Sequence, residues 1–221
     1  MILAVAGGKG GVGKSTVAYN LAAALDAVVV DADLGMADLP AGDGRGPDLH
    51  DVLAGRADPL EAVREGGPVR LLPCGRSLAG ARAADVTGLA RVVRAVDRRY
   101  GDVVLDCPAG MRADAGVPLA VADACVLVAA PRTFALADAL HTRALACELD
   151  AGLVAVALNR TVESPPTEAV AEALGAPVEV VPADPRVGRS VTEGAPVLDV
   201  APESRAGDAL ASLAARVECC R

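Results

Sequence analysis

Aromatic residues and lysines are scarce in this sequence. Its 221 residues include one Phe, two Tyr and no Trp, so we expect a core built from Ala, Val and Leu. The shortage also argues against a surface that stacks the bases of single-stranded nucleic acid on aromatic rings. Of the 21 basic residues 19 are arginines, and the two lysines, Lys9 and Lys14, lie close together in the chain.

Long apolar runs and regular cysteine spacing are also missing. No stretch approaches the roughly 18 apolar residues that a membrane-spanning helix needs, and the chain begins with a strand-like run without a charged leader. We therefore expect a cytoplasmic protein, with peripheral membrane association as the alternative. The six cysteines are irregularly spaced, which favours reduced thiols. A net charge of -8 argues against general attraction to DNA, and 52% hydrophobic residues exclude a disordered chain.

Apolar runs alternate with amphipathic stretches, a pattern typical of βαβ units around a parallel sheet that is buried on both faces. We expect strands at residues 2–6, 27–30, 69–73, 103–106, 124–129, 153–158 and 178–181. We expect helices at 15–25, 85–99, 134–149, 166–174 and 204–219. No internal repeat or long linker appears, so the sequence predicts one α/β domain over residues 1–221, with a mostly parallel, twisted sheet flanked by helices on both faces.

The first expected strand leads into a glycine-rich segment that fits the phosphate-loop pattern GxxxxGK[ST] of P-loop NTPases. The segment reads Gly8-Lys9-Gly10-Gly11-Val12-Gly13-Lys14-Ser15. Glycines let successive N–H groups point at phosphate oxygens, and the following helix adds the positive end of its dipole. We expect Lys14 to reach the β- and γ-phosphates and the Ser15 hydroxyl to coordinate Mg²⁺. The alternative is a glycine-rich turn without a ligand.

Lys9 is the less ordinary residue of this loop. In a chain that otherwise uses arginine, a lysine here indicates a need for a compact ammonium group. From the start of the loop, Lys9 does not easily fold back onto the phosphates of its own loop. It can instead reach the phosphates of a partner subunit across a twofold axis. The alternative is a solvated loop lysine.

The segment Lys9–Ser15 matches the signature KGGxGK[ST]. In this the chain resembles the deviant Walker A ATPases, the family of the cell-division protein MinD and the partition ATPase ParA, and it is most similar to the MinD branch. The resemblance implies ATP and Mg²⁺ as ligands, hydrolysis to ADP and phosphate, and an ATP-dependent homodimer. It implies nucleotide contacts from Gly8, Gly10, Gly11, Val12, Gly13, Lys14, Ser15 and Thr16.

Three aspartates lie at the ends of expected strands. Asp31 and Asp33 stand in the sequence DADLG, similar to the first switch D-x-D-x-G of the family, and side chains at i and i+2 point to one side of a strand. The resemblance implies that Asp33 orients or activates the attacking water, and that Asp31 lies near the metal. Asp106 ends an expected strand and is followed by Cys-Pro-Ala-Gly, and this segment resembles Walker B and the second switch. The resemblance implies that Asp106 contributes to the same metal site as Ser15. The alternative for the first pair is an acidic strand-end turn.

The resemblance also implies three contacts to the adenine base. Asn159 closes a strand, and its amide can pair with the edge of a purine; Pro182 and Asp184 lie in a loop after the next strand. The alternative for Asn159 is a strand-end cap. With these, the catalytic candidates are Lys9, Lys14 and Asp33, and the metal candidates are Ser15, Asp31 and Asp106.

The chain departs from the MinD pattern at its C-terminal segment. That segment lacks the basic amphipathic helix with which MinD proteins bind membranes, which argues against membrane association of that kind. We expect an ATP-switched homodimer that acts on an unidentified protein partner or activator in division-site or other spatial positioning. The alternatives are a DNA-partition ATPase, which the acidity disfavours, and a nucleotide-responsive scaffold with negligible turnover.

Overall fold

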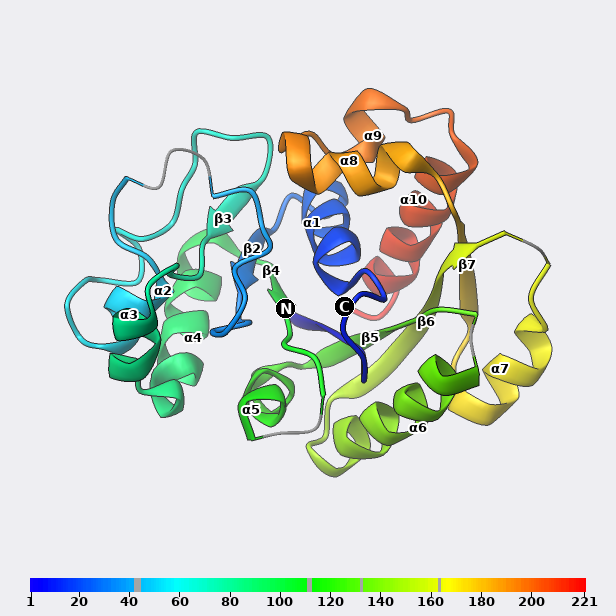
Figure 1. Cartoon of the computed structure of the whole chain (residues 1–221), viewed down its shortest axis with the longest axis horizontal. Helices are drawn as coiled ribbons and strands as arrows, with labels where there is room; N and C mark the ends of the chain where they lie inside the picture. Colours follow the sequence, from blue (N-terminus) through cyan, green and yellow to red (C-terminus); the bar gives the residue numbers. More distant parts are fainter. Residues whose placement is uncertain (42–44, 111–112, 132, 163) are drawn as a thin grey trace.

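The computed structural model describes residues 1–41, 45–110, 113–131, 133–162 and 164–221. Within these ranges seven strands form one sheet in the order β3-β2-β4-β1-β5-β6-β7 (Figure 1), and every pairing is parallel. The strands are β1 Ile2–Ala6, β2 Val28–Asp31, β3 Arg70–Leu72, β4 Val103–Asp106, β5 Ala124–Ala129, β6 Gly152–Thr161 and β7 Val178–Pro182. All seven strands expected from the sequence are therefore confirmed, with ends shifted by no more than three residues.

Helices cover both faces of the sheet. They are α1 Lys14–Ala24, α2 Leu49–Leu53, α3 Leu78–Ala83, η1 Val86–Gly88, α4 Leu89–Tyr100, α5 Ala113–Val121, α6 Thr133–Glu148, α7 Thr167–Leu174, α8 Pro185–Glu193, α9 Val197–Val200 and α10 Arg205–Glu218. Figure 1 shows α1 and α10 on one side of the sheet and α5 and α6 on the other. The α/β fold class with helices on both faces is thus confirmed.

The alternation of side chains along β1 explains the two layers. Leu3 and Val5 join Val17 of α1 and Leu213 of α10 in one buried cluster. Their neighbours along the strand, such as Ala4, join the buried residues of α4 and α6 in a second cluster on the opposite face. Because successive residues of a strand point to opposite faces, one apolar strand supplies both cores.

Five helices of the described ranges were not expected from the sequence, namely α2, α3, α5, α8 and α9. The single helix expected at 85–99 is a 3₁₀ turn followed by α4. The five unexpected helices have nine residues or fewer, and α5 contains Pro118. Such short segments span too few turns to show a clear helical period. Their presence is marked instead by caps, for example Asp48 at α2 and Ser77 at α3.

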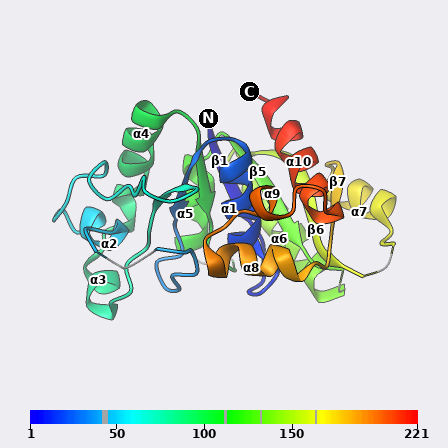
Figure 2. The ribbon, with the colours of Figure 1, turned by 90° about the horizontal axis from the view of Figure 1, so that it is seen from above.

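The strand order indicates where a ligand should bind, namely at the edge of the sheet where the carboxyl ends of the strands next to β1 lie. β1 lies between β4 and β5. The connection that leaves its carboxyl end leads to β2 on one side, and the connection that leaves β4 leads to β5 on the other side. Open parallel sheets bind ligands at such a switch point. Figure 2 shows α8 along this edge and both termini at the opposite one. No helix of the described ranges is long and apolar enough to cross a membrane.

Candidate functional site

The glycine-rich loop runs from the end of β1 to the first residue of α1. Gly13 caps α1 with a left-handed φ of 98° and without a side-chain hydrogen bond, which leaves the first N–H groups of the helix available to a ligand. A Cβ at Gly8 would lie 2.5 Å from the Cβ of Asp138 on α6. The loop therefore requires glycine both for its conformation and for its fit against α6, as expected of a phosphate-binding loop.

Two side chains from the end of β6 hold this loop. Asn159 donates from Nδ2 to the carbonyl oxygen of Val12 at 2.9 Å, and Arg160 donates from Nη1 to that of Gly11 at 2.8 Å. A β-bulge separates Asn159 from Thr161 in the pairing with β7, and Arg160 adopts a left-handed φ of 61°. The sequence motifs assign no role to Arg160, although its place directly after Asn159 at a strand end is a signal for one.

Asp31 and Asp106 lie next to each other at the carboxyl edge. They are paired residues of β2 and β4, and each is 1% exposed. Oδ1 of Asp31 and both carboxylate oxygens of Asp106 accept no hydrogen bond of normal geometry from the described residues. Buried carboxylates without partners are costly, so this arrangement indicates a site for a cation.

The titration of these carboxyl groups reflects the same burial. Burial, with repulsion from Asp106, raises the pKa of Asp31 to about 8. Burial raises the pKa of Asp106 to about 7, although the nearby Ser15 hydroxyl and Lys14 ammonium oppose the shift. Asp33 is half-buried, and burial raises its pKa too, while the amide of Gly35 and Lys14 lower it. Asp33 and Asp106 thus lie within the electrostatic range of Lys14, and Asp31 interacts electrostatically with Asp33 and Asp106.

This donor set fits Mg²⁺. The ion prefers hard oxygen ligands and is commonly held by one or two carboxylates, a hydroxyl and the phosphates of a nucleotide. Ser15, Asp31 and Asp106 supply a hydroxyl and two carboxylates with unpartnered oxygens. Within the described residues, no group of three or more His, Cys, Asp or Glu side chains forms a metal site, so nucleotide and water oxygens would complete the shell.

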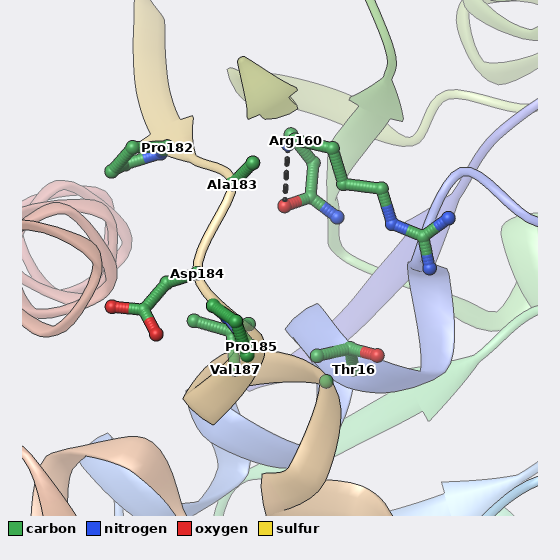
Figure 3. Close-up of a pocket in the computed structure, with 9 residues that line it drawn as sticks. Thr16, Arg160, Pro182, Ala183, Asp184, Pro185 and Val187 are labelled. Carbon is green, nitrogen blue, oxygen red and sulfur yellow. Dashed lines mark hydrogen bonds between the residues drawn. The ribbon is translucent and has the colours of Figure 1, made fainter. Parts of the chain in front are cut away.

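A cavity of about 390 Å³ opens beside the loop (Figure 3). Figure 3 shows Thr16 of α1 and Arg160 on one side of it and the segment from Pro182 to Val187 on the other. Its lining residues are Thr16, Asn159, Arg160, Pro182, Ala183, Asp184, Pro185, Val187 and Gly188. The three residues predicted to contact the base, Asn159, Pro182 and Asp184, therefore meet at one cavity next to Thr16.

Two of these residues already have partners in the protein. The amide of Asn159 donates to Val12 and its Oδ1 accepts from the N–H of Arg160 at 3.0 Å. Asp184 caps α8 by accepting from the N–H of Arg186 at 2.8 Å, and a salt bridge with the same arginine lowers its pKa. Both groups thus shape the cavity, and their contact with a base stays a prediction.

The remaining predicted residues occupy different positions around the loop. Lys14 is 7% exposed and lies near the carboxylates, whereas Lys9 is exposed at the rim. Cys107, next to Asp106, is fully buried, and burial raises the pKa of its thiol well above the usual range. It therefore packs as a small neutral side chain.

Comparison with known proteins identifies relatives over almost the whole chain. The family model described as the CobQ/CobB/MinD/ParA nucleotide binding domain matches residues 3–197. An uncharacterised ATP-binding protein of Methanocaldococcus jannaschii is 34% identical, over 97% of this chain and 86% of its own length.

Solved structures show the same likeness. The cell division ATPase MinD of Pyrococcus furiosus is 31% identical, with a TM-score of 0.92 over 100% of this chain and 99% of its own. The septum site-determining protein MinD of Pyrococcus horikoshii, solved with Mg-ADP, is 31% identical, with a TM-score of 0.91 over 98% of this chain and 95% of its own. The chain therefore belongs to the CobQ/CobB/MinD/ParA family of nucleotide-binding domains.

Proposed function

We propose that this protein is a Mg-ATP-dependent ATPase that dimerises on ATP binding and acts as a switch in spatial positioning, as MinD proteins do. One observation carries the proposal: a glycine-rich loop, a buried lysine and a pair of buried aspartates with unpartnered oxygens meet at one edge of the sheet. Phosphoryl transfer needs little covalent chemistry from the protein, and this arrangement provides positioning and charge. The likeness to MinD structures, one of them with Mg-ADP, supports it.

The phosphates would lie in the loop. The open N–H groups at the start of α1 and the positive end of its dipole favour anions there. Lys14 would add a positive charge at the β- and γ-phosphates, and Ser15, Asp31 and Asp106 would hold Mg²⁺. When bound, the ion neutralises charge that develops on the phosphates.

Asp33 is the candidate that orients the attacking water. It follows β2 in the turn that leaves the buried edge, and it is half-buried and within the electrostatic influence of Lys14. A carboxylate at the solvent boundary can accept a hydrogen bond from a water that enters from outside. The deeper Asp31 lacks such access, since it is 1% exposed.

The base would occupy the cavity next to Thr16. Its volume of about 390 Å³ lies within the range of small-molecule sites. Pro182 and Val187 provide apolar surface, and Asn159 and Asp184 provide polar edges. Adenine rather than guanine follows from the family resemblance.

A dimer would place Lys9 against the phosphates of the partner. Lys9 is exposed at the start of the loop, and Met36 in the turn after Asp33 is 62% exposed at the same edge of the sheet. A large exposed apolar side chain at this edge suits a surface that a second copy covers when ATP is bound. ATP would thus convert the edge of the sheet into an interface.

Phosphate release and light scattering test the proposal together. Wild-type protein with Mg-ATP should release phosphate slowly, and Asp33→Ala should abolish release and accumulate as an ATP-bound dimer. Lys9→Ala should also abolish release while it retains much of the ATP binding, with Lys9→Arg as the matched charge control. A strictly monomeric Asp33→Ala variant with bound ATP would refute the switch.

The partner on which the protein acts is tested by measuring whether candidate partners stimulate phosphate release. Under the proposal, a protein activator raises the phosphate-release rate, and duplex DNA does not. ATP-dependent, salt-sensitive DNA binding would favour a partition ATPase instead. Bound ATP without release under every condition would favour a scaffold.

A further inference from the structure

The buried residue His50 of α2 contacts the turn that carries Asp33. Its side chain is 2% exposed, and its Nε2 lies 3.1 Å from the carbonyl oxygen of Leu34, the residue after Asp33. We propose that His50 is a positioning residue that fixes this turn, and with it the carboxylate of Asp33, relative to the phosphate loop. The proposal rests on the role proposed above for Asp33.

The direction of this hydrogen bond follows from its partner. A carbonyl oxygen can only accept, so Nε2 carries the proton and donates it to Leu34. The other ring nitrogen, Nδ1, has no hydrogen-bond partner among the described residues. The nearby thiol of Cys74 lies 3.5 Å from Nε2 and donates to the carbonyl of Gly75, and burial raises its pKa, so it stays neutral. No anion at Cys74 therefore draws the imidazole away from the turn.

Hydrogen bonds at the start of α2 fix the backbone around His50. Asp48 and Asp51 form a capping box at the start of α2, and the N–H of Leu49 donates to the carbonyl of Pro73 at 2.9 Å, directly after β3. Leu49 is fully buried in the core. These contacts fix the backbone on both sides of His50, so its ring has a defined position from which to hold the turn that carries Asp33.

Two glycines provide the space for the imidazole. A Cβ at Gly75 would collide with the ring at Nδ1, and a Cβ at Gly80 of α3 would lie 3.0 Å from the same atom. Neither glycine has a positive φ, so backbone conformation does not explain them. The slot between α2 and α3 accordingly fits the ring of His50 and sets its orientation.

The turn beyond Leu34 has mainly local hydrogen bonds. The N–H of Met36 donates to the carbonyl of Asp33 at 3.1 Å, and the N–H of Gly35 donates to its Oδ1 at 3.3 Å. Gly35 and Met36 are exposed. β2 fixes the chain before Asp33, and His50 fixes it one residue after, so the carboxylate is held from both sides.

Variants at residue 50 test this role directly. His50→Leu removes the donor and keeps an apolar side chain, whereas His50→Gln restores an N–H donor at nearly the same reach. We expect kcat for ATP hydrolysis to fall about tenfold or more in His50→Leu, because displaced catalytic groups lose rate steeply. KM for ATP and Kd for ADP should stay within about twofold, and His50→Gln should recover most of kcat. The exposed His141→Leu is the matched control.

A second variant and a second readout separate this role from simple folding. Gly75→Ala keeps His50 and displaces its ring, so it should reproduce the loss of kcat. Hydrogen exchange of the nucleotide-free protein should show amides of residues 34–36 exchanging faster in His50→Leu and Gly75→Ala, and restored in His50→Gln, while β1 and β4 remain protected. If wild-type protein does not hydrolyse ATP, the proposed function fails, and the exchange experiment still tests His50. Unchanged exchange of residues 34–36 in His50→Leu, or equal impairment of His50→Gln, would overturn the positioning role.

Discussion

Asn20 connects the phosphate-loop helix to the cavity proposed for the base, and its replacement by Ala should weaken both stability and nucleotide binding. The side chain lies on α1 and is 0% exposed. Its Nδ2 donates to the carbonyl of Thr16 at 2.8 Å and to Oγ of Ser190 on α8 at 2.9 Å. Its Oδ1 accepts from the N–H of Val197 at the start of α9 at 2.7 Å.

The stability lost in Asn20→Ala depends on which hydrogen bonds the partners of Asn20 retain. Oγ of Ser190 still donates to the carbonyl of Val187 at 2.8 Å. The buried N–H of Val197 loses its acceptor, which costs about 1–3 kcal/mol, and the vacated volume adds to this. We expect a total loss of roughly 2–4 kcal/mol in the free energy of unfolding. Ser190→Ala removes two neutral hydrogen bonds, one from the amide of Asn20, which keeps Thr16, and one to the carbonyl of Val187, so it should cost about 1–2 kcal/mol.

Urea unfolding followed by far-UV circular dichroism measures both variants, because the chain has no Trp to serve as a fluorescence probe. Calorimetric titration with ADP and with tripolyphosphate separates the base from the phosphates. α8 carries Val187 and Gly188 of the cavity, so Asn20→Ala should weaken ADP more than tripolyphosphate. The reasoning is wrong if Asn20→Ala costs no more than Ser190→Ala, or if the two ligands lose affinity equally.

Three further predictions concern Asp31 and the two residues that hold the loop, Asn159 and Arg160. The pKa of Asp31 is raised from its ordinary value to about 8, so the folded protein binds the extra proton and stability is lost as the pH rises from about 4 to about 8. In metal-free urea titrations, Asp31→Asn should therefore gain stability over wild type as the pH rises from 5 to 8, and Mg²⁺ binding by wild type should strengthen over the same range; a pH-independent difference would contradict this. Asn159→Ala leaves the carbonyl of Val12 without its buried partner and should weaken ADP binding and lower stability by about 1–3 kcal/mol. Arg160→Ala removes an exposed contact to Gly11 and should cost less than about 1 kcal/mol while still weakening ADP, as calorimetry and thermal unfolding would show; a larger loss of stability in Arg160→Ala would reverse our ranking.

The sheet and the edge of the site could be predicted from the sequence because both depend on short-range patterns. An apolar run followed by Asp, as at Asp31 and Asp106, marks a buried parallel strand that ends at the carboxyl edge. All strands of a parallel sheet end on the same side, so residues far apart in sequence meet there. The structure follows this rule, because Asp31 of β2 is paired with Asp106 of β4.

The side-chain contacts that join distant segments around the sheet could not be predicted in the same way. The contact of Asn20 with Ser190 joins residues 170 positions apart, and that of His50 with Leu34 joins a short helix to a turn. A buried Asn or His on a helix has no periodic signature, and the position of its partner depends on how the whole chain packs. Likewise, Arg160 points at the loop because a bulge turns it there, and a bulge arises from the pairing of two strands.

These buried polar side chains position other parts of the site. The aspartates proposed for the metal, Asp31 and Asp106, lie at strand ends, where the sheet fixes their backbone positions. The elements proposed to contact the ligand are held by polar side chains from elsewhere, among them Asn159 for the loop, Asn20 for α8 and His50 for the turn after Asp33. A directional bond to a buried donor holds one geometry more strictly than apolar packing does, because its loss strands a polar group. Substitutions at these three positions should therefore separate the functions of the site, with loss of base affinity at Asn20, loss of loop order at Asn159 and loss of turnover at His50.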